Sequence, residues 1–188
     1  MIYPDQFIPV LEKNGYVIDV DNFIWNKVCA CIKMMEDKGI EPVPISVNVS
    51  RMHVYQEKFT ENLKNMAGEY GIDPKYIPLE ITESAFTKEE GSLFKKVQSL
   101  QGYGFKFSMD DFGSGYSSLG MLKSERVDEV KIDKTFVDDI ATDKGKVLLG
   151  NVIRMINELG IDMIAEGVET KEQADFLKEN GCMYAQGY

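Results

Sequence analysis

The chain has 188 residues, 44% of them hydrophobic, and a formal net charge of −10. This length supports one sizeable core and is short for two ordinary domains, so we expect a single domain over residues 1–188. No run approaches the roughly 18–20 uncharged apolar residues of a membrane span, and we expect a soluble, cytoplasmic protein. Because binding to a nucleic-acid backbone relies on Lys and Arg, the excess of 31 acidic over 21 basic residues argues against DNA or RNA as a partner.

The cysteines and the single histidine disfavour most thiol and imidazole chemistry. Cys29, Cys31 and Cys182 form no C-x-x-C pair, and the first two lie on different faces of a predicted helix. With His53 as the only histidine, the chain is poorly equipped for a His/Cys zinc site or for a Ser-His-Asp or Cys-His mechanism. We interpret the cysteines as reduced, buried thiols.

Strand-like and helix-like segments alternate along the chain. Segments with helical periodicity lie between short apolar runs that are rich in β-forming residues. This alternation predicts an α/β fold with a parallel sheet, either doubly wound or closed as a (β/α) barrel. The predicted strands are Ile45–Val49, Ile77–Ile81, Phe105–Met109, Val127–Ile132, Ile161–Ala165 and Cys182–Ala185.

Helix faces and helix ends can also be predicted. The motifs Thr87-Lys88-Glu89-Glu90 and Thr170-Lys171-Glu172-Gln173 both fit a capping box, and Gly181 is expected to follow the end of the second helix. A period of 3.6 residues predicts two apolar faces. The first comprises Phe23, Ile24, Val28, Cys31, Ile32 and Met35, and the second comprises Leu148, Val152, Met155, Ile156 and Leu159.

Polar or acidic residues lie at or near the carboxyl ends of the predicted strands. In parallel α/β folds these ends form the face where ligands bind. Taken singly, such an acid also fits a helix cap, a turn or an edge-of-strand salt bridge. Taken together, five of these residues are expected to converge on one rim. They are Asn48, Glu80, Asp110, Asp111 and Glu166.

Crowded carboxylates point to bound cations, because they repel one another unless they hold protons or share a cation. Ligands that are all oxygen atoms favour Mg²⁺, Mn²⁺ or Ca²⁺ over zinc. Asp110 and Asp111 are adjacent and point differently at a strand end, so they could serve two ions about 3.5–4 Å apart. Such a pair of ions can activate a water for phosphodiester cleavage and allows an acidic protein to hold an anionic substrate.

Two nearby patterns suggest other functions and are rejected. The segment Gly113–Ser118 nearly fits the G-x-G-x-x-G of a dinucleotide-binding fold, but the third glycine is a serine and two aspartates would face the pyrophosphate. The motif Asp111-Phe112-Gly113 matches the kinase DFG, but the chain has neither an HRD-type loop nor a VAIK-type lysine strand.

Six motifs in chain order resemble successive motifs of EAL-domain cyclic-di-GMP phosphodiesterases. They are Ser46–Ser50, Leu79–Ser84, Asp110–Leu119, Lys131–Val137, Ala165–Thr170 and Gln186–Tyr188. The opening Pro4–Pro9 is similar to a segment that the family carries just after its second strand. The resemblance covers essentially the whole chain. It implies a TIM-like (β/α) barrel that hydrolyses cyclic di-GMP to linear pGpG with Mg²⁺ or Mn²⁺.

The resemblance also implies a role for each matching residue. Lys131 would hold or polarise the attacking water, and Glu169 would assist catalysis beside Glu166 at the second metal ion. Gln186 would contact the dinucleotide. Glu83 would anchor loop 112–118, which the family uses to couple metal binding to dimerisation. The implied ligands are Asn48, Glu80 and Asp110 for one ion, and Asp110, Asp111 and Glu166 for the other.

One departure from the family bears on activity. The Glu-Ala-Leu tripeptide and its nearby arginine, which supply a metal ligand and a substrate contact, occur nowhere in the 188 residues. Six predicted strands are also fewer than the eight of a closed barrel. We therefore expect an incomplete barrel that lacks its first strands, before Met1, and its extreme C-terminus. A longer parent protein would carry sensor or GGDEF domains and could be anchored in a membrane.

Two functions stay open on these grounds. The first is a phosphodiesterase that is active in the intact parent protein, with the isolated chain weak or inactive. The second is a catalytically silent EAL-like module that binds cyclic di-GMP or a protein partner. For the 188 residues alone, the two exposed strand edges of an open barrel favour strand swapping or a homodimer.

Overall fold

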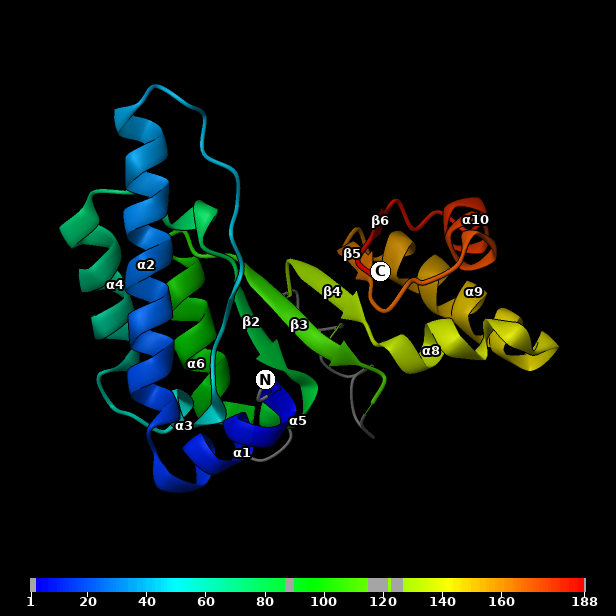
Figure 1. Cartoon of the computed structure of the whole chain (residues 1–188), viewed down its shortest axis with the longest axis horizontal. Coiled ribbons are helices and arrows are strands. Elements are labelled where there is room, and N and C mark those ends of the chain that lie inside the picture. The colour runs from blue at the N-terminus through cyan, green and yellow to red at the C-terminus, as the bar shows by residue number, and fades with distance from the viewer. Residues whose placement is uncertain (1–2, 87–89, 115–121, 123–126, 188) are drawn as a thin grey trace. The chain divides into compact units, whose positions relative to one another are not determined.

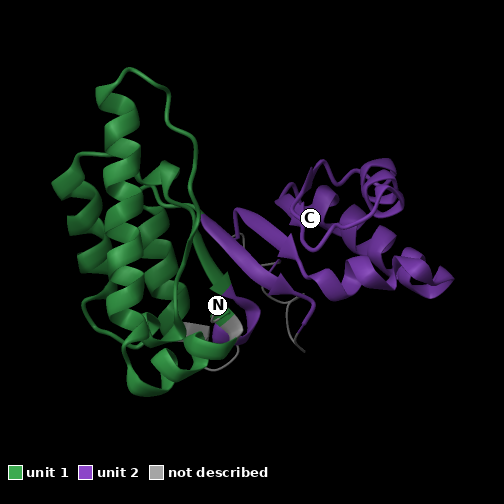
Figure 2. Ribbon diagram, in the orientation of Figure 1, with its two compact units in different colours: residues 1–81, 90–106 green, residues 82–89, 107–188 purple. Residues whose placement is uncertain are grey.

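The computed structural model describes residues 3–86, 90–114, 122 and 127–187. The chain groups into two compact units (Figure 2), one made of Met1–Ile81 with Glu90–Lys106 and the other of Thr82–Glu89 with Phe107–Tyr188. The described residues contain the six expected strands with helices between them (Figure 1), which confirms the α/β class. The single domain stays a prediction. No helix in the described residues combines the length and apolarity needed to cross a membrane.

Unit 1 contains two short parallel strands and a group of helices. Val47 pairs with Leu79 and Asn48 pairs with Glu80, so β1 and β2 run in the same direction. Helix α4 packs against both α2 and α6 (Figure 1). The strands are β1 (Val47–Asn48) and β2 (Leu79–Thr82), and the helices are α1 (Pro4–Asn14), α2 (Val17–Asp37), α3 (Arg51–Val54), α4 (Phe59–Tyr70), the 3-10 turn η1 (Pro74–Tyr76) and α6 (Glu90–Gln101).

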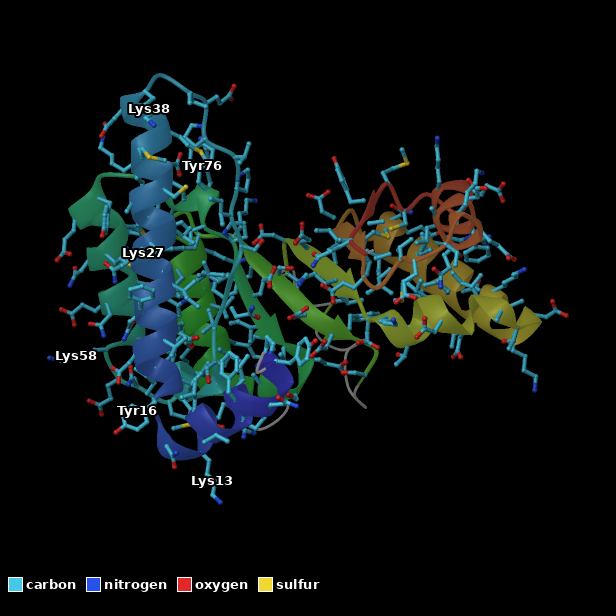
Figure 3. All side chains as sticks on the ribbon, viewed as in Figure 1. Lys13, Tyr16, Lys27, Lys38, Lys58 and Tyr76 are labelled. Atoms are coloured by element: carbon cyan, nitrogen blue, oxygen red, sulfur yellow. The ribbon has the colours of Figure 1, made fainter. Side chains whose placement is uncertain are left out.

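The predicted apolar face of α2 is wrong in its position around the helix. Phe23 and Ile24 are 62% and 45% exposed. On the outer side of the helix, Lys27 Nζ lies 5.3 Å from the centroid of the Phe23 ring, and the labelled Lys27 can be followed in Figure 3. A polar residue, Asp21, belongs to the buried stripe, whereas the predicted face contains only apolar residues. The buried residues of α2 are Val17, Asp21, Trp25, Cys29 and Ile32.

Unit 2 contains four parallel strands that pair in chain order. Strand β3 pairs with β4, β4 with β5, and β5 with β6. The strands are β3 (Phe107–Phe112), β4 (Glu129–Ile132), β5 (Asp162–Ala165) and β6 (Tyr184–Ala185), and the helices are α5 (Glu83–Phe86), α8 (Lys134–Asp138), the 3-10 turn η2 (Asp139–Ala141), α9 (Asp143–Glu158) and α10 (Lys171–Glu179).

Two details of the unit 2 helices test the sequence predictions. Thr170 and the side chain of Gln173 form the predicted capping box at the start of α10, which is confirmed. The predicted face of α9 is displaced, since Leu148 and Leu159 are 53% and 49% exposed. Its buried residues are Gly145, Leu149, Ile153 and Ile156. The other predicted capping box includes residues 87–89, outside the described residues.

Candidate metal-binding site

A β-bulge near the end of β3 brings the carboxylates of the adjacent Asp110 and Asp111 close together. Met109 pairs with Val130 and Phe112 with Ile132, so β3 has one residue more than β4 between the same two points. Asp111 has a φ of 55°, the left-handed conformation that aspartate tolerates better than most side chains. In a regular strand neighbouring side chains would face opposite sides of the sheet. The bulge removes that alternation where the two carboxylates lie.

Asp110, Asp111 and Glu166 form a compact group of carboxylates. One carboxylate oxygen from each lies within 4.8 Å of the other two, and all three side chains are half-buried. Glu166 follows β5 directly, and its backbone N–H donates to the carbonyl of Ile132 at 3.0 Å. The carboxyl ends of two strands therefore bring these acids together, as expected for parallel strands.

Lys131 lies among these carboxylates. It projects from β4 and is only 7% exposed. Its Nζ is 3.1 Å from Asp110 Oδ1 and 2.7 Å from Glu166 Oε1. A buried ammonium is tolerated only when it is paired, and these two carboxylates supply the pairing.

The carboxylate group retains an excess of negative charge. Burial raises the pKa of Asp111 above its ordinary value, and the charges of Asp110, Asp133 and Glu166 raise it further, whereas Lys131 acts in the opposite direction. The site contains three carboxylates and one lysine, and its candidate metal ligands are all oxygen atoms. Such a site suits a hard divalent cation such as Mg²⁺ or Mn²⁺. The residues present therefore fit the cofactor that the sequence predicts.

Asn48 and Glu80 occupy matching positions in unit 1. They are register partners on the parallel strands β1 and β2, which places their side chains on one face of the pair. Val47 and Leu79, one residue earlier on each strand, are buried at 2% and 0% exposure. The polar side chains therefore face away from the core of unit 1. Their role as ligands alongside Asp110 stays a prediction.

Glu83 lies beneath the turn that follows β3. Its side chain is fully buried, and Oε2 accepts a hydrogen bond from the Gly113 N–H at 3.1 Å. Loop 112–118, which Glu83 is predicted to anchor, is described only as far as Ser114. Its anchoring role stays a prediction.

Two predicted site residues lie outside the carboxylate group. Glu169 is exposed and forms an ion pair with Lys134 Nζ. Gln186 is also exposed, and its backbone is fixed because its N–H donates to Ala165 at 2.8 Å and its carbonyl accepts from Val168 at 3.1 Å. Their catalytic and substrate-binding roles stay predictions.

Asp133 is a residue that the sequence reasoning did not assign to the site. It caps α8, where its Oδ1 accepts from the Thr135 N–H at 2.9 Å, and its charge acts on Asp111. The available signal was its place directly after the strand that carries Lys131.

A family model described as "EAL domain" matches residues 1–188. The chain belongs to the EAL domain family. Among curated relatives of this EAL domain is the signaling protein YkoW of Bacillus subtilis (strain 168), 34% identical over 186 residues that cover 98% of this chain and 23% of YkoW. Another is the "Bifunctional diguanylate cyclase/cyclic di-GMP phosphodiesterase MucR" of Pseudomonas aeruginosa, 30% identical over 189 residues that cover 100% of this chain and 28% of MucR.

A solved structure shares the fold of this EAL domain. The "PaMucR Phosphodiesterase, c-di-GMP complex" superposes with a TM-score of 0.91 at 30% identity, covering 99% of this chain and 76% of that one. This likeness confirms the EAL-type, TIM-like architecture, of which the described residues contain six strands. The chain spans about a quarter of the length of the two curated relatives named above.

Proposed function

We propose that this EAL domain is the catalytic portion of a cyclic di-GMP phosphodiesterase, which hydrolyses cyclic di-GMP to linear pGpG with two Mg²⁺ or Mn²⁺ ions. The observation that carries this assignment is the group of Asp110, Asp111 and Glu166 with Lys131 among them. The names of MucR and of its solved complex support the choice of substrate.

The ligands divide into two overlapping sets. Divalent ions held in this way would lower the pKa of a water and stabilise charge on the leaving oxygen. Asp110 would belong to both sets. One set is Asn48, Glu80 and Asp110, and the other is Asp110, Asp111 and Glu166.

Lys131 is the proposed residue that orients the attacking water. An ammonium group carries three N–H donors, and two carboxylates fix its position from different sides. A water held by Lys131 adds its oxygen to phosphorus, and the bond from phosphorus to the 3′ oxygen breaks. The water loses a proton and the 3′ oxygen gains one, which leaves a free 3′ hydroxyl and a 5′ phosphate.

Three further residues have supporting roles in this proposal. Glu169, whose carboxylate pairs with Lys134, would assist near Glu166, and Gln186 would contact the dinucleotide. Glu83 would anchor the turn at Gly113 through the hydrogen bond it accepts there.

The proposed setting is a cytoplasmic homodimer within a longer signalling protein. The relatives support a longer chain, since MucR is named for both a diguanylate cyclase and a phosphodiesterase activity. A sensor or a GGDEF-type cyclase domain would then control the EAL domain.

A silent receptor is the second candidate. It is favoured by one observation, the absence of the Glu-Ala-Leu tripeptide from the 188 residues. A receptor would bind cyclic di-GMP without cleaving it. For the isolated chain we propose weak or absent hydrolysis on the same ground.

Product analysis separates the two functions. The protein as encoded in its genome, including any sequence upstream of Met1, is incubated with cyclic di-GMP and Mn²⁺, and pGpG is measured by chromatography. If the protein is a phosphodiesterase, pGpG should form, and it should be lost when a chelator is added and in Glu166→Gln. Glu172→Gln, which alters an exposed acid on α10, should still form pGpG. Tight binding without pGpG would instead establish the receptor.

A further inference from the structure

Two buried side chains of α2 carry polar atoms that reach the end of β1 and the residues after it. Asp21 and Trp25 are four residues apart, so they lie on the same face of the helix, and they are only 7% and 2% exposed. Trp25 forms a hydrogen bond with the backbone of Asn48, and Asp21 forms one with the backbone of Ser50. An ordinary core stripe would be apolar at Asp21, and its buried carboxylate therefore needs a specific explanation.

Trp25 holds the carbonyl of Asn48. Its indole Nε1 donates to that oxygen at 3.0 Å. The bond is partly buried, where a hydrogen bond is electrostatically stronger than in water. Fixing the carbonyl restricts rotation of the backbone at Asn48, and so restricts the direction in which its exposed side chain leaves the strand.

Asp21 holds the turn two residues further on. Its Oδ2 accepts a hydrogen bond from the Ser50 N–H at 3.2 Å. Ser50 in turn begins helix α3, because its hydroxyl accepts from the Met52 N–H at 3.3 Å. The carboxylate of α2 thus fixes both the end of β1 and the start of the next helix.

His53 completes the group from the other side. Its ring centroid lies 4.4 Å from that of Trp25 and 6.0 Å from that of Phe59, and the residue is 2% exposed. Its Nε2 lies 3.2 Å from Asp21 Oδ2 without the geometry of a hydrogen bond. The ring packs on the indole and shields the Asp21 carboxylate from water.

The same segment is also held by the neighbouring strand. The Val49 N–H donates to the carbonyl of Glu80 at 2.9 Å, in register with the pairing of Asn48 and Glu80. The backbone on both sides of Asn48 is therefore fixed, by α2 on one side and by β2 on the other. Packing alone would not require that the polar atoms of Asp21 and Trp25 be directed at this one segment.

We propose that Asp21, Trp25 and His53 are positioning residues, which fix the Asn48 carboxamide in the orientation needed to bind a divalent cation. This inference rests on the proposed function, in which Asn48 is a ligand. It adds three residues that contact neither substrate nor metal. Substitution of these residues is expected to lower the affinity for a cation at Asn48.

The test is Mn²⁺ titration of the ¹⁵N-labelled 188-residue chain, followed through the side-chain amide signals of Asn48. Paramagnetic broadening of these signals reports cation binding without any turnover. In Trp25→Phe, which keeps an aromatic ring but loses the N–H donor, we expect the Mn²⁺ concentration for half-broadening to rise about fivefold. The expected rise is larger in Asp21→Ala than in Asp21→Asn, because asparagine retains an acceptor for the Ser50 N–H.

A matched control separates positioning from general loss of stability. Leu100→Val removes one methylene from a fully buried site on α6, which lowers stability but alters no contact to Asn48 or Ser50. Its half-broadening concentration should stay within about twofold of the parent chain. If Trp25→Phe and the Asp21 variants behave like Leu100→Val, the positioning role is wrong while the ligand role stands. If Mn²⁺ fails to broaden Asn48 in the unaltered chain, the ligand role is wrong, and the positioning role falls with it.

Discussion

Lys131 Nζ lies 2.7 Å from Glu166 Oε1, at the ends of two neighbouring strands of unit 2. The ammonium group partly neutralises the carboxylates that are proposed to bind a cation. It therefore competes electrostatically with that cation, although the proposed reaction needs it. Removal of Lys131 should therefore raise the affinity for the cation and lower the rate of hydrolysis.

Lys131→Met is the variant that tests this opposition. Without the ammonium, Mn²⁺ should bind more tightly, on the order of tenfold, because a positive charge a few ångströms away repels it. In the full-length protein, hydrolysis should fall about 10²–10⁴-fold. Calorimetric titration gives the affinity, and pGpG formation gives the rate.

Lys171→Met is the matched control for this change. It removes another lysine from unit 2, where the ammonium pairs with exposed Asp175. Surface pairs of this kind contribute little, so Mn²⁺ affinity should change less than twofold or so. Weaker Mn²⁺ binding in Lys131→Met would contradict the proposed competition and indicate that the lysine is needed to build the site.

Asp111→Asn should stabilise the metal-free protein at neutral pH. Burial, and then repulsion from Asp110, raise the pKa of Asp111 above 3.8 in the folded state. The contribution of this group to stability is therefore fully present below about pH 4 and is lost as the pH rises through the folded pKa. Asparagine removes that loss and tolerates the φ of 55°.

The expected size is a rise in Tm of about 2–4 °C at pH 7 in the presence of chelator, shrinking toward zero below about pH 4. Thermal unfolding over a series of pH values measures it. Asp175→Asn, which removes an exposed partner of Lys171 on α10, should show no such pH dependence. A Tm difference that stays constant with pH would exclude relief of charge repulsion as the cause.

The sequence was informative where a general rule of α/β folds applied. Carboxyl ends of parallel strands share an edge, so the meeting of Asp110 with Glu166 could be expected, and the structure places them in one group. Asn48 and Glu80 are register partners on β1 and β2, and their expected convergence with these acids stays a prediction. These predictions needed only strand positions that were correct to within a few residues.

Other features depended on geometry that no periodic pattern encodes. The bulge at Asp111 is a local irregularity, and nothing in the alternation of residues shows which strand carries the extra one. The buried stripe of α2 was missed because Asp21 looks like a surface residue until its partner, the Ser50 N–H, is known. The face of α9 was displaced because exposed Leu148 and buried Leu149 are equally apolar.

The position of Gly113 requires glycine, because its backbone conformation and its surroundings both exclude a side chain. Its φ is +97°, and a Cβ atom would lie 1.8 Å from Phe136 Cε2. Its N–H also donates to the buried carboxylate of Glu83, so displacement of Gly113 would weaken that hydrogen bond. A side chain at this position therefore has two costs, backbone strain and collision with Phe136.

Gly113→Ala should consequently destabilise the protein by about 3–5 kcal/mol, the range of severe single changes. Gly160→Ala isolates the first cost, because Gly160 has a φ of +69° and nothing within 4 Å of an added Cβ. It should cost only about 1–2 kcal/mol. Urea denaturation measures both values. Adding Phe136→Leu to Gly113→Ala should recover part of the loss, with a coupling of about 0.5–3 kcal/mol. Equal costs for the two alanine variants would mean that Phe136 moves aside freely and does not fix the turn that follows the two aspartates.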